Sequence, residues 1–368
     1  MKITRLSLIG CTLLSFAAGC TAAAPQDPYA GADSTDDAGA ADSPTARLVT
    51  GFTQRDLVSD RPGAATLDAN LVNPWGIAFN PAGPVWIANN HSGTSTVYDA
   101  HGALKLTVAF PQASGTSDLA SPTGQVFNAS ATEFAADTFI FDAEDGRVYG
   151  WKPGAGVTVR ADNSGSHAIY KGLAIATADD GAQRLYLADF HNAKIDVLDA
   201  SYHPVVLAGG FIDPQIPAGY APFNAQALEG KIFVSFAKQG ADAVDDDKGV
   251  HRGYVDQFDT DGNFERRLIT RGALNSPWAL AIAPSSWGQY AGALLVGNFG
   301  NGRVHLYDIH APASHGREKV VALGSLGVGH SAVVIDGLWA LAFGPDEQLY
   351  FTAGQNGEEN GLFGMLAR

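Results

Sequence analysis

Amide, carboxylate and indole side chains recur in two sets of predicted turns that flank short apolar strands. Amide and carboxylate oxygens can hydrogen-bond a polar ligand or coordinate calcium, and indoles offer flat apolar area for stacking. The candidate ligand-binding residues are Asn73, Trp75, Asn89, Gln125, Asp142, Asp189, Asn224, Gln226, Trp278, Asn298 and Trp339. Lys171, Asn90, His91 and His191 lie in equivalent turns.

These residues also have a structural explanation. The three tryptophans recur with a sequence repeat, which favours packing between repeats over a ligand cage. Asn73 and Asn224 lie beside prolines or aromatic residues, where an amide commonly hydrogen-bonds its own turn. Asp142, Asp189 and Asn298 follow strands at equivalent places, and turn stabilisation accounts for them as well. Several carboxylates and amides directed at one point would favour a binding site instead.

Other acidic segments give weak signals for calcium. The segment 259–263 (DTDGN) resembles the opening of an EF-hand loop, but its glycine falls at the fourth position and Thr270 stands where a glutamate belongs, so it predicts a hairpin turn. An acidic cluster follows the predicted strand 232–236, and it fits a solvated loop or a weak calcium site: Asp242, Asp245, Asp246 and Asp247. The sequence contains no Gly-x-Ser-x-Gly, His-Glu-x-x-His or phosphate-binding glycine motif.

One unit of about fifty residues recurs along the chain, with starts at 73, 121, 170, 224, 276 and 337. Its clearest copies begin Asn73-Pro74-Trp75, Ser276-Pro277-Trp278 and Gly337-Leu338-Trp339. Each copy has room for four short strands and their turns, as a β-propeller blade requires. The sequence therefore predicts an all-β, six-bladed propeller over residues 47–368, with both sets of turns around the mouth of its central channel.

The last copy has room for only three strands before Arg368. The segment before the first copy, residues 49–58, has the pattern of a strand pair with a break at Thr50-Gly51. We therefore expect residues 52–58 to pair with 362–366 and to close the ring through the N-terminal strand. An open solenoid is the rival architecture, and it would leave strand edges exposed.

The amino terminus has the features of an export signal. Lys2 and Arg5 precede an apolar run over residues 6–18, which is too short to span about 30 Å of hydrocarbon. The segment 16–20 (FAAGC) resembles a bacterial lipoprotein signal, which implies removal of residues 1–19 and lipidation of Cys20, although Ala17 replaces the usual leucine. Residues 20–46 are rich in Ala, Asp, Ser, Gly and Pro and predict a disordered tether. We expect a cell-envelope lipoprotein, with ordinary secretion as the alternative.

Composition excludes some partners. The chain has 368 residues, 38 acidic against 23 basic, and a formal net charge of −15, which would repel nucleic acid and anionic lipid. Cys11 lies in the export signal, so the mature chain would lack a thiol pair and depend on its core for stability. We expect a monomer that contacts the membrane only through its lipid anchor and binds an unknown ligand or protein.

Two segments, 185–195 (LYLADFHNAKI) and 295–304 (LVGNFGNGRV), resemble NHL-type propeller repeats. Residues 57–79 and 335–344 more closely resemble an uncharacterised family of exported bacterial six-bladed propellers, a likeness that covers roughly 50–365. That resemblance implies the fold and no agreed activity. Similar lactonase-type propellers hold calcium with one glutamate, an aspartate and asparagines, whereas no glutamate stands at an inner-strand start here.

Three functions remain open from the sequence, of which a purely structural role at the cell surface is the least favoured. The first is a binding module that recognises a ligand or protein through its channel face, without catalysis. The alternative is a calcium-dependent lactonase-, esterase- or lyase-like enzyme with its site at the central channel, supported by fold analogy alone. No catalytic residue or metal ligand is assigned, and calcium is the only cofactor considered.

Overall fold

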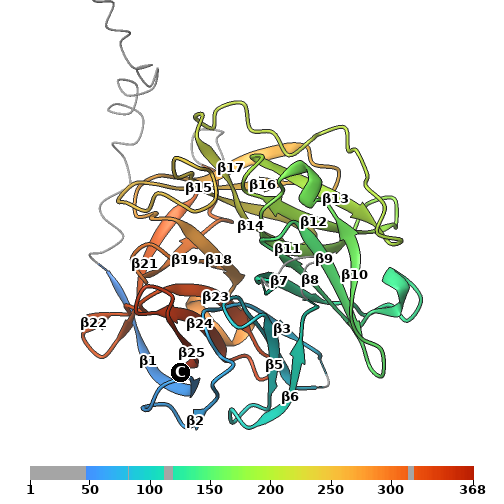
Figure 1. Ribbon diagram of the computed structural model, residues 1–368. Coiled ribbons are helices and arrows are strands. Elements are labelled where there is room, and N and C mark those ends of the chain that lie inside the picture. Colours follow the sequence, from blue (N-terminus) through green and yellow to red (C-terminus); the bar gives the residue numbers. More distant parts are fainter. Residues whose placement is uncertain (1–46, 82, 112–118, 314–318) are drawn as a thin grey trace, which may run out of the picture. The chain divides into compact units, whose positions relative to one another are not determined.

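β-Strands dominate the part of the chain that the structure describes. The structure is a computed structural model that describes residues 47–81, 83–111, 119–313 and 319–368 (Figure 1). Its helical elements there are three short 3-10 segments: η1 (Phe134–Ala136), η2 (Ser164–Ser166) and η3 (Ser285–Tyr290). The all-β class is confirmed. The expected signal, Cys20 and tether, residues 1–46, lie outside the described residues, and no described helix is long and apolar enough to cross a membrane.

Consecutive antiparallel strands form the sheets, as in propeller blades. The first sheet contains β3 (Pro74–Phe79), β4 (Val85–Asn89), β5 (Thr94–Tyr98) and β6 (Leu104–Ala109). The second contains β7 (Pro122–Phe127), β8 (Phe139–Ala143), β9 (Arg147–Lys152) and β10 (Gly156–Asp162). The third contains β11 (Tyr170–Thr177), β12 (Gln183–Asp189) and β13 (Lys194–Asp199). The fourth contains β14 (Tyr220–Leu228), β15 (Lys231–Lys238), β16 (Tyr254–Phe258) and β17 (Phe264–Thr270).

Two further strand sets are joined into one ten-stranded sheet. One set contains β18 (Pro277–Ile282), β19 (Leu294–Asn298), β20 (Val304–Asp308) and β21 (Val321–Val328). The other contains β23 (Leu338–Phe343), β24 (Leu349–Gln355) and β25 (Asn360–Ala367). Two short strands, β2 (Thr66–Leu67) and β22 (Ser331–Ala332), pair with β1 and β21. Every expected repeat start lies beside or inside the first strand of a set.

Strand β1 (Leu48–Ser59) joins the two sets (Figure 1). Its first residues pair in parallel with β21, Leu48 opposite Ser325. Its later residues pair antiparallel with β25, from Thr53 opposite Ala367 to Ser59 opposite Leu362. The pairing expected between 52–58 and 362–366 is therefore present, and the change of partner occurs around Gly51, whose φ of +101° suits glycine.

The innermost strands lie against one another. Contacts link β3 to β7, β7 to β11, β11 to β14, β14 to β18, β18 to β23, and β23 to β3. Small residues permit this approach: a Cβ on Gly76 would lie 2.6 Å from the Thr123 carbonyl oxygen, and one on Gly124 would lie 2.4 Å from the Leu173 nitrogen. The first residues of these strands are consequently brought close together.

Candidate functional site

Residues with a left-handed backbone conformation directly precede three of the inner strands. Asn73 has a φ of +47°, Ser276 of +48° and Gly337 of +66°, and they directly precede β3, β18 and β23. Asparagine and glycine tolerate this backbone region better than most residues. The same local turn therefore occurs at equivalent places in the three clearest repeat copies, and each turn is followed two residues later by a tryptophan.

The three tryptophans meet at one end of the inner strands. Trp75 stacks on Trp339 with ring centres 3.5 Å apart, and Trp278 meets their edges at 6.2 and 5.9 Å. Phe299 stacks on the other face of Trp339 at 4.0 Å. Each indole is 2% exposed. These side chains form a packed cluster, the aromatic cluster, which agrees with packing rather than with an open ligand cage.

A buried ammonium group lies beside this aromatic cluster. Lys171, near the start of β11, has a side chain that is 1% exposed and donates to the carboxylates of Glu144 and Asp245, the latter at 3.0 Å. Its Nζ lies 5.3 Å from the centre of the Trp75 ring, close enough for a cation–π interaction. The Trp278 indole N–H donates to the Lys171 carbonyl oxygen at 2.8 Å.

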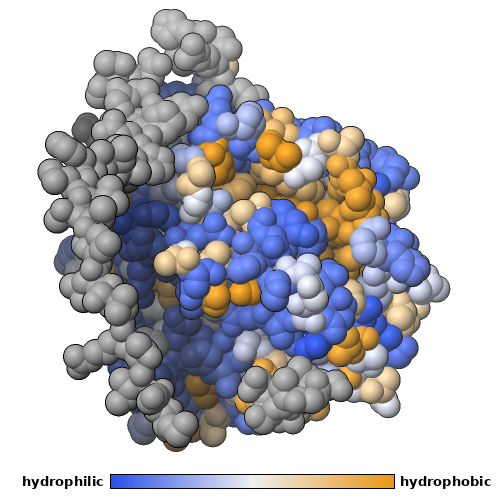
Figure 2. All heavy atoms as spheres, turned by 45° about the horizontal axis from the view of Figure 1, so that its top comes forward, coloured by the Kyte–Doolittle hydropathy of each residue, from blue (hydrophilic) through white to orange (hydrophobic). Residues whose placement is uncertain are grey.

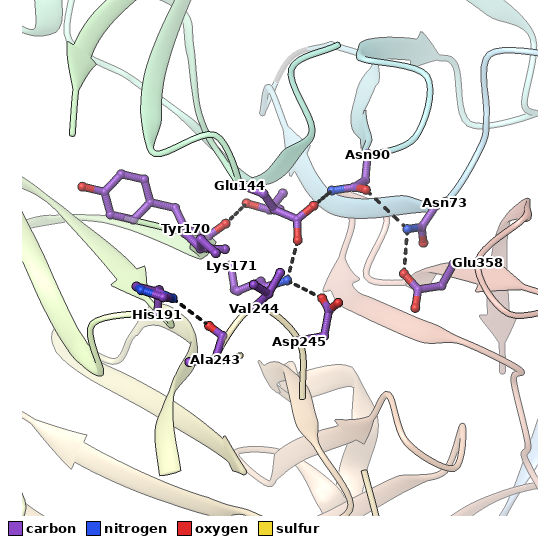
Figure 3. A network of polar contacts seen from close by, with 12 residues as sticks. Asn73, Asn90, Glu144, Tyr170, Lys171, His191, Ala243, Val244, Asp245 and Glu358 are labelled. Carbon is purple, nitrogen blue, oxygen red and sulfur yellow. Dashed lines mark hydrogen bonds and ion pairs between the residues drawn. The ribbon is translucent and has the colours of Figure 1, made fainter. Parts of the chain in front are cut away.

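Amide side chains extend the contacts of Lys171 into a network (Figure 3). Asn90 donates to Glu144 at 2.9 Å, and Asn73 donates to Asn90 at 3.5 Å and to Glu358 at 2.8 Å. The Trp339 indole N–H donates to the Asn73 side-chain oxygen at 2.9 Å. We call Asn73, Asn90, Glu144, Lys171, Asp245 and Glu358 the mouth network. It is connected to the aromatic cluster by direct hydrogen bonds.

Five strand sets contribute to the mouth network. Asn73 and Asn90 flank the first two strands of the first sheet, Glu144 follows β8, and Lys171 belongs to β11. Asp245 lies in the loop between β15 and β16, and Glu358 lies in the turn between β24 and β25. A Cβ on Gly354 would lie 2.0 Å from the Asn73 side-chain oxygen, so glycine there leaves space for the network. Convergence of this kind distinguishes a site from isolated turn stabilisation.

Burial and charge set the protonation of this network. Burial alone would lower the pKa of Lys171, but Glu144 and Asp245 outweigh it and the pKa is raised. Burial raises the pKa of Glu358, and the nearby Glu144 carboxylate raises it further, while the Asn73 hydrogen bond opposes both. The network carries three carboxylates against one ammonium group, and the Asp245 side chain is 77% exposed. It therefore presents an excess of negative charge to solvent.

Several of the expected site residues stabilise turns of their own sheet. Asn89 donates to Thr94 and Thr96 at 3.1 and 2.9 Å, and Asp189 accepts from the Asn192 side chain at 2.8 Å. Asn298 donates to the Ala273 carbonyl oxygen at 2.8 Å. All three expected residues are fully buried. Their side chains contact backbone, hydroxyl and amide groups of the same sheet or of the segment that leads into it.

Other expected residues join neighbouring inner strands. Gln125 donates to the Gly76 carbonyl oxygen at 2.7 Å, and Asn224 donates to that of Trp278 at 2.9 Å. With Gln226 and Trp278 they line a channel cavity of about 40 Å³, which suits a few water molecules.

Asp142 is a fully buried carboxyl that faces the neighbouring inner strand. It accepts from the Thr123 hydroxyl at 2.9 Å and from the Gly124 N–H at 2.6 Å, and its second oxygen has no hydrogen-bond partner among the described residues. Burial raises its pKa to about 7. Its hydrogen bonds run to β7, and among the described residues it bonds no side chain of the mouth network.

The carboxylates considered as calcium ligands do not fit a shared ion. Asp142 and Asp189 are committed to separate hydrogen-bond sets, and no group of three His, Cys, Asp or Glu side chains within the described ranges could hold a metal. Asp259 accepts from the N–H groups of Asp261 and Asn263, which makes 259–263 the expected turn.

The acidic cluster of the β15–β16 loop is tied to basic groups. Asp245 contacts Lys171, and Asp247 pairs with Lys238 at 3.2 Å and with Arg252. Asp246 keeps one buried oxygen without a partner in the described part of the chain, and burial raises its pKa. The loop is therefore bound to the sheets by ion pairs instead of being only solvated.

Glu144 and Glu358 are the network residues that the sequence did not single out. Glu144 directly follows β8, just as Asn90 directly follows β4, so the repeat register contained a signal for it. Glu358 lies in the third position after β24, where turn length decides its direction. Both reach the mouth from the turn after the second strand of their sheets and not from the start of an inner strand.

Comparison with known proteins supports the fold and gives no reaction. No family model matches the chain. It is 32% identical over 341 residues to uncharacterized protein R648 of Acanthamoeba polyphaga mimivirus, covering 88% of this chain and 82% of that protein. The soluble aldose sugar dehydrogenase of Escherichia coli has a similar structure at 13% identity, with a TM-score of 0.52 over 86% of this chain and 99% of that one.

Virginiamycin B lyase from Staphylococcus aureus is a second similar structure, at 11% identity. Its TM-score is 0.50 over 86% of this chain and 100% of that one. Both likenesses are to propeller-like structures, and at such identities they concern the fold alone. Protein R648 is viral, so this comparison does not support the expected bacterial source.

Proposed function

Because the chain belongs to the family of the mimivirus protein R648, whose name assigns no reaction, we propose a function from the site itself: a propeller-type binding module that takes a cationic ligand at the mouth network. The observation that carries this proposal is the convergence of six polar side chains from five strand sets, with three carboxylates and one ammonium group. A ligand with an amine or guanidinium group would complement that charge.

We propose that the scaffold is a six-bladed ring closed by β1. The cyclic contacts of the six innermost strands support this architecture, as does the antiparallel pairing of β1 with β25. In such a ring the mouth network lies at one opening of the central channel, and the aromatic cluster closes the channel beneath it. The ligand would therefore bind on the ring face and would not pass through it.

The carboxylates of the mouth network differ in their availability. Glu144 accepts from both Lys171 and Asn90 and is committed to the network. Asp245 is largely exposed and contacts Lys171 through one oxygen, and Glu358 accepts from Asn73 through one oxygen. Asp245 and Glu358 are therefore the groups with oxygens to offer. A calcium-dependent enzyme would need converging oxygen ligands, and the site geometry does not favour it.

A short basic peptide tests the proposed function. Tetralysine amide should bind the full chain in isothermal titration at low salt, and D245N should weaken binding about threefold to tenfold through loss of an exposed carboxylate. Raising the salt concentration should weaken binding by screening. Because the pKa of Glu358 is raised, its carboxylate should become protonated at a higher pH than an ordinary glutamate. Acidification should therefore also weaken binding.

The matched control for this titration is D180N. Asp180 lies in the turn between β11 and β12, is 56% exposed and pairs with Arg184 at 2.5 Å. The D180N substitution therefore removes the same charge as D245N, at a place outside the mouth network. Binding should be unchanged in D180N and absent for tetraglutamate. Equal losses in D245N and D180N would show a general charge effect and would refute the site.

We also propose that the protein is exported and anchored by a lipid on Cys20, with residues 20–46 as a tether. The expected outcome is that the chain sediments with membranes in a bacterial host and that C20A moves to the soluble fraction. Fractionation followed by immunoblotting measures this. An unchanged distribution of C20A would remove the lipid anchor from the proposal and leave secretion.

A further inference from the structure

The third sheet ends at β13, so the outer edge of this strand is partly open. The chain returns beside it only briefly: Val205 N–H donates to the Val197 carbonyl oxygen at 2.8 Å, and Asp199 N–H donates to that of His203 at 2.9 Å. Val197 and Asp199 thus direct their backbone groups outward. Because these directions alternate along an antiparallel strand, Ile195 directs its N–H and C=O the same way. No described residue pairs with them.

A groove runs along the same edge. Its volume is about 330 Å³, and its walls are β13, the segment 204–207 with Phe211, and the turn around Asn163 and Ser166. Val206, on the groove wall, is 98% exposed. Apolar side chains reach the surface at several places on the face drawn in Figure 2. An open strand edge beside an unfilled groove is a template for pairing with another strand.

We propose that this edge pairs with β13 of a second copy of the chain, antiparallel and about a twofold axis at Ile195. In this register the two Ile195 residues exchange both of their outward hydrogen bonds. A register moved towards Val197 would meet the segment around Val205, which already occupies that position. The pairing is therefore confined to residues 194–196 of each copy, because Val205 already occupies the position beside Val197. This short pairing is self-complementary, as a twofold interface requires.

Charge complementarity supports a second copy as the occupant. Lys194 and Asp196 flank Ile195 and form an ion pair at 2.7 Å. In the proposed register Lys194 lies opposite Asp196 of the second copy, and Asp196 lies opposite Lys194 of the second copy. Opposite charges across strands stabilise the pair, whereas like charges destabilise it. The two copies together would place four charges of alternating sign on one face of the joined sheets.

Sedimentation equilibrium of the full chain over a range of concentrations tests the proposal. We expect a reversible monomer–dimer equilibrium. K194E should weaken the dimer about tenfold, because it converts two opposite-charge pairs into two like-charge pairs. Lys194 is 45% exposed, so the variant should fold like the natural chain. Thermal melting would verify that the two proteins have the same stability.

The matched control is K105E on β6, the outermost strand of the first sheet. Lys105 is 50% exposed and paired with Asp99 at 2.8 Å, so the variant makes the same charge change at another sheet. The proposal requires K105E to dimerise like the natural chain. It is overturned by a chain that stays monomeric at every concentration, by an unaffected K194E, or by equal weakening in both variants.

Discussion

Deletion of residues 47–59, which removes β1, is expected to abolish the cooperative fold. Four of its apolar side chains are buried: Val49, Phe52, Leu57 and Val58. Burial of one such side chain contributes about 1.5–3 kcal/mol, so their loss approaches the 5–15 kcal/mol that typically stabilises a whole domain. The deletion also leaves the facing edges of β21 and β25 without a partner.

Near-UV circular dichroism and thermal melting of the deletion variant measure this effect. Two point variants of the full chain separate the effect of lost packing from the effect of a shortened chain. V58D places a carboxylate at a position that is 0% exposed and should also unfold the protein, whereas R55D lies at an exposed position of the same strand and should melt normally. If the deletion variant melted cooperatively at the melting temperature of the natural chain, β1 would not be holding the two ends of the chain together.

The repeats could be predicted from the sequence because the same local turn recurs. Asn73, Ser276 and Gly337 have similar left-handed backbones, and each precedes an inner strand with a tryptophan at its second position. Such signals are local and appear in a single sequence. The pairing of β1 with β25 was also predictable, because a last copy with three strands lacks one partner.

The mouth network could be predicted only in part, because side-chain direction changes from one residue to the next. Asn89 ends β4 and contacts two threonines of its own sheet, whereas the adjacent Asn90 reaches Glu144 of the next sheet. The sequence marked both asparagines without distinguishing their roles. Lys171 and Asp245 are 74 residues apart, and their ion pair depends on the path of the β15–β16 loop.

The missing fourth strand of the third sheet was not foreseen either. The repeat length predicted four strands for this copy, but residues after Asp199 pair only briefly with β13. Pro204 lacks a donor for strand pairing, and the chain then turns towards Phe211. The open edge of β13 follows from this local departure.

Replacement of Lys171 by methionine is expected to lower the free energy of unfolding by about 3 kcal/mol. Removal of one partner from a buried ion pair costs about 3–5 kcal/mol, because the remaining charge loses its compensation. The lower end applies here, since Glu144 is 24% exposed and Asp245 is 77% exposed, and both can gain contact with water. Urea unfolding at neutral pH measures the change.

The pH dependence of the natural chain follows from the same ammonium group. Because the folded state raises the pKa of Lys171, its stabilisation is present below the ordinary lysine value of 10.5 and is lost as pH rises through the raised value. K171M should therefore lose less stability than the natural chain on passing into that alkaline range. This comparison separates the contribution of Lys171 to the pH dependence from that of the buried tyrosines, because both proteins contain the same tyrosines.

K105M is the matched control for K171M, because Lys105 pairs with Asp99 at the surface with 50% exposure. An exposed pair contributes about 0–1 kcal/mol, so K105M should unfold within that margin of the natural chain. A loss in K171M as small as that in K105M would contradict a structural role for the buried ammonium group. A large loss in K171M alone would mean that the ion pairs of Lys171 hold the second, third and fourth sheets together.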